Sequence, residues 1–400
     1  MTTTDGTTGI DPHDHLIGPP PPPADIGREP YVDLLRASSL LIVVLWHWVF
    51  TIFQVTDDKI AVTSPLAFYD NFWILTWFFQ VMPLFFFVGG FAHTIVWSKV
   101  QRRDGGYRTF VAGRLKRLLG PLLTLAIIAI AFGVMAALIT GWAWMLGTAI
   151  LIMTPVWFLG LYALLVLIAP PCIAAHQRWG GVCVVVLAAW VGLNDMLRFA
   201  QGIEWVGAVN LVVVWAFCHQ FGFNYGRIRD GSREMAWMLF LGGLGALVVL
   251  TTTDLYPPSM VGVPGDPISN MSPPTLAIVA LCTLQAGGVI LIRPWMVARL
   301  ETRKRWQLFS EYANKFSMPV FLLHTTGLAL TLAFLLLVFG YFPPPEPNLE
   351  WWLTRPLYVI LPALFTAPLI YLFGGRMTKK QRSEPVLPSG ETARDPERNW

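Results

Sequence analysis

Charged residues are scarce in this chain: Asp, Glu, Lys and Arg together make up 13% of its 400 residues. A soluble domain carries roughly a quarter, so about half of the usual charge is missing. Hydrophobic residues make up 55% of the chain, and the mean hydropathy is +0.56. This composition excludes a disordered protein and a nucleic-acid-binding protein, because both depend on polar or basic sequence. It indicates a polytopic membrane protein that contacts lipids and has no nucleic-acid partner.

Cysteine is also rare, and the four cysteines lie singly in apolar runs without a CxxC pair. This spacing excludes a disulfide framework and a zinc site, so no bound metal is expected. Residues 1–30 lack the apolar segment of a signal peptide and contain a run of five prolines. We expect residues 1–30 and 376–400 to be disordered tails that flank a membrane domain at 31–375.

What is abundant is apolar and aromatic sequence, in runs long enough to cross a bilayer. A membrane-spanning helix needs roughly 20 apolar residues, and its backbone must be hydrogen-bonded within the segment. The sequence therefore predicts an all-α, polytopic membrane helix bundle of about ten helices. The expected spans are 32–54, 71–97, 118–139, 148–170, 181–198, 204–222, 234–252, 273–292, 318–341 and 356–374.

The distribution of positive charge predicts the orientation of these spans. With the N-terminus in the cytoplasm, all but three of the 28 Lys and Arg residues fall on the cytoplasmic side. The three on the outside are Lys59, Arg198 and Arg355. Because short cytoplasmic loops carry an excess of Lys and Arg, we expect a multi-pass protein of the plasma membrane with both termini in the cytoplasm.

Ionisable residues within the first apolar run are the sharpest candidates for function. Arg36 and His47 are eleven residues apart, just over three helical turns, so both project from nearly the same face. Their separation along the axis is about 16–17 Å, which places Arg36 at the cytoplasmic rim and His47 near the midplane. Asp33 lies three residues before Arg36 and can pair with it.

Two interpretations of this pattern are open. In one, Asp33 and Arg36 are an interfacial anchor and His47 is an interhelical hydrogen-bonding residue. In the other, His47 is a general base within the membrane, and Arg36 is a cation that binds phosphate below it. Histidine suits the second role because its ordinary pKa lies near neutrality.

The pattern D-x-x-R-x(10)-H formed by Asp33, Arg36 and His47 resembles the signature of the bacterial membrane acyltransferase family 3. Four further motifs follow in the order typical of that family. They are Pro83-Leu-Phe-Phe-Phe-Val-Gly-Gly-Phe91, Arg114-Leu-Lys-Arg-Leu-Leu-Gly-Pro121, Trp157-Phe-Leu159 and Ser317-Met-Pro-Val-Phe-Leu-Leu-His324. The resemblance extends over about residues 31–375. It departs from the family at Gly89, where the family usually has serine.

The resemblance implies an O-acyltransferase with no permanently bound cofactor. The donor substrate would be a cytoplasmic acyl-CoA, with acetyl-CoA expected, and the acceptor a hydroxyl of an envelope carbohydrate, a glycolipid or a metabolite. The residues implied are His47 and Arg36 for catalysis, Arg36, Arg114, Arg117 and Asp33 for the acyl-CoA, and Phe86, Gly90, Trp157 and His324 for the motif core and donor channel. No residue pattern indicates an oligomeric state.

Two other classes of protein are compatible with part of this pattern. Buried histidines in a ten-helix bundle also suit a proton-coupled secondary transporter, although acidic residues are scarce at mid-membrane. The glycine at position 89 leaves room for a non-catalytic scaffold or sensor. We expect His93 and His219 to serve in packing, and Asp195 to form a local pair with Arg198.

Overall fold

The computed structural model describes residues 29–56, 59–140, 142–253 and 255–378. The expected tails, 1–30 and 376–400, lie almost wholly outside this range. The long helices are α1 (Pro30–Phe50), α3 (Met82–Gln101), α4 (Tyr107–Thr140), α5 (Trp142–Met153), α6 (Val156–Trp179), α7 (Val182–Gln201), α8 (Val206–Gly222), α10 (Arg233–Thr252), α11 (Leu276–Thr302), α12 (Lys304–Phe339) and α14 (Leu357–Thr378). The short elements are β1 (Ile52–Thr56), β2 (Lys59–Thr63), the 3-10 turns Pro65–Ala67 and Asp70–Phe72, α2 (Trp73–Phe79), α9 (Tyr225–Asp230) and α13 (Leu349–Leu353).

The all-α membrane architecture is confirmed. In the described part of the chain, eight helical stretches are long and apolar enough to cross a membrane. Two shorter apolar helices, Val206–Gly222 and Leu357–Phe373, coincide with the sixth and tenth expected spans. Each of the ten expected spans therefore has a helical counterpart.

The first expected span, 32–54, is too long at its C-terminal end. Helix α1 ends at Phe50, and Ile52–Thr56 then pairs with Lys59–Thr63 as an antiparallel hairpin, with Ile52 opposite Thr63. β-branched residues recur in both strands, and these residues favour extended backbone over helix. Only their hydrophobicity made the first of these strands resemble the end of a membrane helix.

Proline accounts for two breaks that the expected spans did not contain. The span 71–97 divides into α2 and α3, and Pro83 lies in the first turn of α3. The span 148–170 divides into α5 and α6, and Pro155 immediately precedes α6. Proline has no N–H to donate and is tolerated at the start of a helix, where that N–H would have no partner.

Two helices extend further into the basic segments between the spans than expected. Helix α4 begins at Tyr107 instead of residue 118, so Arg114 and Arg117 lie on a helix and not in a loop. Helix α12 begins at Lys304 instead of residue 318. The basic segment 98–117 is consequently mostly helical.

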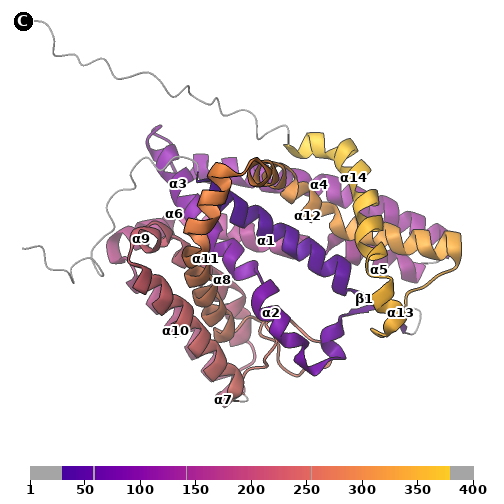
Figure 1. The fold of residues 1–400 in the computed structure, drawn as a ribbon, viewed down its shortest axis with the longest axis horizontal. Coiled ribbons are helices and arrows are strands. Elements are labelled where there is room, and N and C mark those ends of the chain that lie inside the picture. Colours follow the sequence, from indigo (N-terminus) through magenta and orange to yellow (C-terminus); the bar gives the residue numbers. More distant parts are fainter. Residues whose placement is uncertain (1–28, 57–58, 141, 254, 379–400) are drawn as a thin grey trace, which may run out of the picture.

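Helix α1 runs through the middle of the bundle, packed against α12 and α3 (Figure 1). Helix α3 in turn packs against α8. Gly90 of the α3 motif allows the two backbones to come close. A Cβ atom on Gly90 would collide with the backbone carbonyl of His219. The backbones of α3 and α8 thus meet at a small residue, as is common between membrane helices. This contact fixes the helices that surround the site.

Candidate functional site

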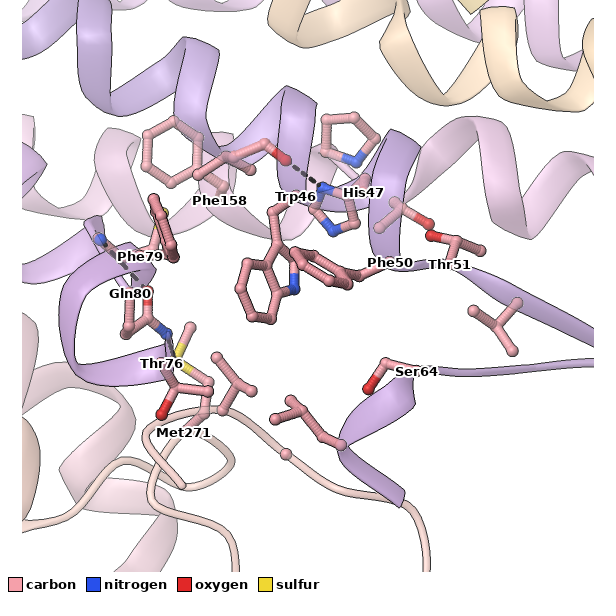
Figure 2. Close-up of a pocket in the computed structure, with 18 of the residues that line it drawn as sticks. Trp46, His47, Phe50, Thr51, Ser64, Thr76, Phe79, Gln80, Phe158 and Met271 are labelled. Atoms are coloured by element: carbon pink, nitrogen blue, oxygen red, sulfur yellow. Dashed lines mark hydrogen bonds between the residues drawn. The ribbon is translucent and has the colours of Figure 1, made fainter. Parts of the chain in front are cut away.

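A cavity of about 300 Å³ lies beside the C-terminal end of α1, and we call it the aromatic pocket. Figure 2 shows Trp46, His47 and Phe50 of α1 along it, with Gln80 and Ser64 on opposite sides of them. Its lining comes from α1, the hairpin and the turn after it, α2, α3, the start of α6, α12 and the loop at 261–271. Aromatic rings combined with a few polar groups are typical of a site that binds a polar ligand with an apolar face.

His47 and His324 meet at this pocket from two different helices. The Nε2 atom of His324 lies 3.2 Å from the Nδ1 atom of His47. A second bond fixes the same two helices, because the indole N–H of Trp48 donates to the backbone carbonyl of His324 at 3.0 Å. His324 is 1% exposed, whereas His47 is only partly buried and lines the pocket. The pair therefore has one member inside the protein and one that a ligand can reach.

The backbone around the pair determines which nitrogen carries a proton. The Nδ1 atom of His47 lies 2.9 Å from the carbonyl oxygen of Val43, and the Nδ1 atom of His324 bonds the carbonyl oxygen of Phe321. A carbonyl only accepts, so each Nδ1 carries the hydrogen. The one Nδ1–H of His47 is then shared between the carbonyl oxygen of Val43 and the Nε2 atom of His324, and the Nε2 atom of His47 keeps its lone pair. This arrangement can remove a proton from a bound hydroxyl.

A second group of polar residues lies towards the other end of α1. Arg36 is 3.5 Å from the carboxylate of Asp33, as the spacing predicted, and 3.5 Å from the amide oxygen of Asn314 on α12. Helix α4, which carries Arg114, contacts α3 and α12, the two helices against which α1 packs. Arg117, one turn further along α4, is exposed.

A family model described as an acyltransferase domain, acyltransferase family 3, matches residues 29–381. The chain belongs to this family. The protein is accordingly a membrane acyltransferase. Neither the search of curated proteins nor that of solved structures gave a match.

The remaining motif residues of the acyltransferase surround this site in different ways. Phe86 is fully buried, with its ring centroid 5.0 Å from that of Trp215. Trp157 is 50% exposed and lines the aromatic pocket directly. A Cβ on Gly89 would lie 3.4 Å from the ring of Tyr162, an ordinary contact. The position where the family usually has serine thus has room for one.

His93 and His219 form a second histidine pair between α3 and α8. The Nδ1 atom of His93 lies 2.8 Å from the Nε2 atom of His219, and the hydroxyl of Tyr162 lies 3.1 Å from the other ring nitrogen of His93. Both histidines are fully buried, consistent with the packing role expected for them. The pair links α3, α6 and α8 beneath the aromatic pocket.

Several site residues were missed by reasoning from the sequence. Gln80 is buried, and its amide N–H donates to the carbonyl of Met260 at 3.3 Å, which holds the loop that contains Met260 against the end of α2. A lone glutamine within an apolar run was the signal for it. Asn314 and the loop at 261–271 gave no such signal, because their roles come from packing between distant segments.

The predicted pair between Asp195 and Arg198 is wrong. The side chain of Arg198 bonds Glu204 at 3.1 Å, while the Asp195 carboxylate accepts from Asn210 at 2.8 Å and from the phenol of Tyr256 at 3.0 Å. Burial, and then the nearby carboxylate, raise the pKa of the Tyr256 phenol, which stays protonated as a donor. Asp195 therefore anchors the loop that contains Tyr256 to α7 and α8.

Proposed function

We propose that this acyltransferase moves an acyl group from cytoplasmic acyl-CoA to a hydroxyl of an envelope carbohydrate, a glycolipid or a metabolite. The observation that carries the proposal is the His47–His324 pair at a pocket that the outer loops help to line. The proposed location is the plasma membrane, with both termini in the cytoplasm. In that orientation Arg36 lies near the cytoplasm, and the aromatic pocket opens towards the outside.

The chemistry follows from the assigned protons. The acceptor hydroxyl in the aromatic pocket gives its proton to the Nε2 atom of His47 while its oxygen bonds to the thioester carbonyl carbon. The C–S bond then breaks, and the departing CoA thiolate takes the proton back from Nε2. His324 accepts from the Nδ1–H of His47 throughout, so it orients the ring and stabilises the charge that His47 carries between the two transfers.

The donor would lie along α1. Phosphates of CoA would bind the guanidinium groups of Arg36 and Arg114 through charge-assisted hydrogen bonds, and Arg117 would add charge at the exposed rim. Asp33 would orient Arg36. The distance of about 16–17 Å between Arg36 and His47 along the helix is the length over which the pantetheine arm would extend.

A covalent route uses the same residues. In it, the Nε2 atom of His47 attacks the thioester directly, CoA leaves, and the acyl-histidine is then attacked by the acceptor hydroxyl. Ping-pong kinetics would support this route, whereas a requirement for both substrates before CoA is released would support direct transfer.

The proposal is tested with the purified protein, radiolabelled acetyl-CoA and octanoyl-CoA, and a crude envelope extract as acceptor. We expect label to move from CoA to the extract. Two results together would contradict the proposal and support a carrier. They are the absence of transfer by well-folded protein and solute uptake into proteoliposomes that depends on a proton gradient.

A further inference from the structure

A second cavity, of about 450 Å³, adjoins the aromatic pocket at His47, and we call it the aliphatic pocket. It lies between α4, α5 and α12, and its lining is apolar apart from His47 and four threonines. At least two of those hydroxyls bond helix carbonyls, Thr154 to Ile150 at 3.1 Å and Thr325 to Ile152 at 3.2 Å. The two pockets share His47, Thr51, Val62 and Thr154.

We infer that the aliphatic pocket holds the hydrocarbon chain of the acyl donor, and that this acyltransferase uses acyl groups much longer than acetyl. The inference rests on the function proposed above. An acetyl group is small enough to stay at His47, and it would leave this pocket without a role. An apolar cavity that begins at the reacting histidine suits a chain that continues from the thioester carbonyl.

The direction of the pocket favours the donor chain over the tail of a lipid acceptor. The pocket follows α12 from Thr325 to Leu337, a rise of about 18 Å. In the proposed orientation this direction leads from the level of His47, near the midplane, towards the outer surface. A donor that enters from the cytoplasm points its acyl chain the same way. A lipid of the outer leaflet would have to turn upside down to bring its headgroup to His47.

The wall of the pocket is open towards the bilayer. Ile139, Ile150 and Leu337 line it and are 55%, 61% and 56% exposed. A chain longer than the pocket can therefore pass into the hydrocarbon of the membrane without a clash. We expect affinity to rise with chain length and then to level off, because carbons that pass beyond the exposed wall make no further contact with the pocket.

Gly147 offers a direct way to fill the pocket. It lines the cavity on α5, and a Cβ atom added there would meet no atom within 4 Å. Gly147→Phe should therefore fold and place its ring in the space for the chain. Gly160→Phe is the matched control, because Gly160 is exposed on α6, has equal room and lines neither pocket.

The experiment measures the affinity of purified wild-type protein and both variants for acetyl-, octanoyl- and dodecanoyl-CoA, and the release of CoA by wild type and His47→Ala. Each buried methylene favours binding by about fourfold, so we expect octanoyl-CoA to bind at least tenfold more tightly than acetyl-CoA. Gly147→Phe should weaken dodecanoyl-CoA binding at least tenfold more than acetyl-CoA binding. Gly160→Phe should leave both affinities at the wild-type values.

Three contrary results are distinguishable. His47-dependent release of CoA with equal affinity for acetyl- and dodecanoyl-CoA would overturn the acyl-chain pocket while leaving the proposed function intact. An equal loss of affinity for all three donors in Gly147→Phe, at the wild-type melting temperature, would also overturn it. Release of CoA that His47→Ala does not reduce, for any donor, would contradict the proposed function itself.

Discussion

The Nε2 atom of His324 lies 3.2 Å from the Nδ1 atom of His47, although the two residues are 277 positions apart in the chain. One histidine is buried and the other faces a pocket, so the buried ring can orient the exposed one. The pair thus has the geometry of a base and its positioning partner, carried by α1 and α12.

His324→Ala should lower kcat for acyl transfer by about 100-fold, because it removes the ring that shares the Nδ1–H of His47 and stabilises the charge on His47, leaving only the Val43 carbonyl as acceptor. The KM for acyl-CoA should stay within about twofold, since His324 does not contact the donor phosphates. His324→Gln should restore part of kcat, because its amide oxygen can accept the same hydrogen bond. A fall in expression or melting temperature with unchanged kcat would instead show that His324 is a packing residue.

Arg36→Ala should raise the KM for acyl-CoA by about 10- to 100-fold, the loss expected for a hydrogen bond to a charged group. The effect should diminish at high salt, where phosphate contacts are screened. Arg178→Ala removes a charge from the last turn of α6, where its guanidinium lies 5.4 Å from the ring of Trp179, and serves as the control. Equal effects of the two substitutions would indicate a general electrostatic contribution and no specific site.

The neighbouring glycines of α3 should respond in opposite ways to the same substitution. Gly90→Ala forces a Cβ against the carbonyl of His219 and should destabilise the fold by about 1–3 kcal/mol. Gly89→Ala meets the ring of Tyr162 at 3.4 Å and should be tolerated. Melting temperatures in detergent compare the two variants. If Gly90→Ala has the same melting temperature as the wild type, α3 and α8 do not come as close at Gly90 as the structure shows.

Glu29 holds the start of α1 to α9 and α11. Its carboxylate lies 3.1 Å from Arg229 and 2.9 Å from Arg293, and it accepts from the phenol of Tyr225 at 2.8 Å. Glu29→Gln should cost about 1–2 kcal/mol, less than for a fully buried pair because both arginines are partly exposed. The melting temperature should fall accordingly.

The control for Glu29→Gln is Glu204→Gln, which removes the carboxylate from a surface pair with Arg198. Glu204 is 76% exposed, so its loss should leave the melting temperature almost unchanged. Equal shifts in the two variants would contradict an anchoring role for Glu29.

What the sequence could predict is what depends on neighbours along the chain. The spacing of Asp33, Arg36 and His47 follows from helical periodicity, and the number of spans follows from runs of apolar residues. Contacts such as Arg36 with Asn314 join residues 278 positions apart and follow no periodicity. The hairpin at Ile52–Thr63 was not predicted because its first strand is as hydrophobic as a membrane helix.

The hydrogen-bond partners of buried residues could not be predicted from the sequence for a similar reason. The sequence marks Asp195 as an acidic residue at the end of a span, and Arg198 as its nearest basic residue. Only folding brings Asn210 and Tyr256 to that carboxylate. The aliphatic pocket is equally invisible in the sequence, because leucines that line a cavity have the same composition as leucines that face lipid.

The most direct test of the account is CoA release by purified wild-type protein and by His47→Ala, measured at saturating acyl-CoA with envelope extract present. We predict that wild type releases CoA and that His47→Ala, folded and with unchanged affinity for acyl-CoA, loses at least 100-fold in rate. Release at the wild-type rate by His47→Ala would contradict the account, because no base would then be needed at that position.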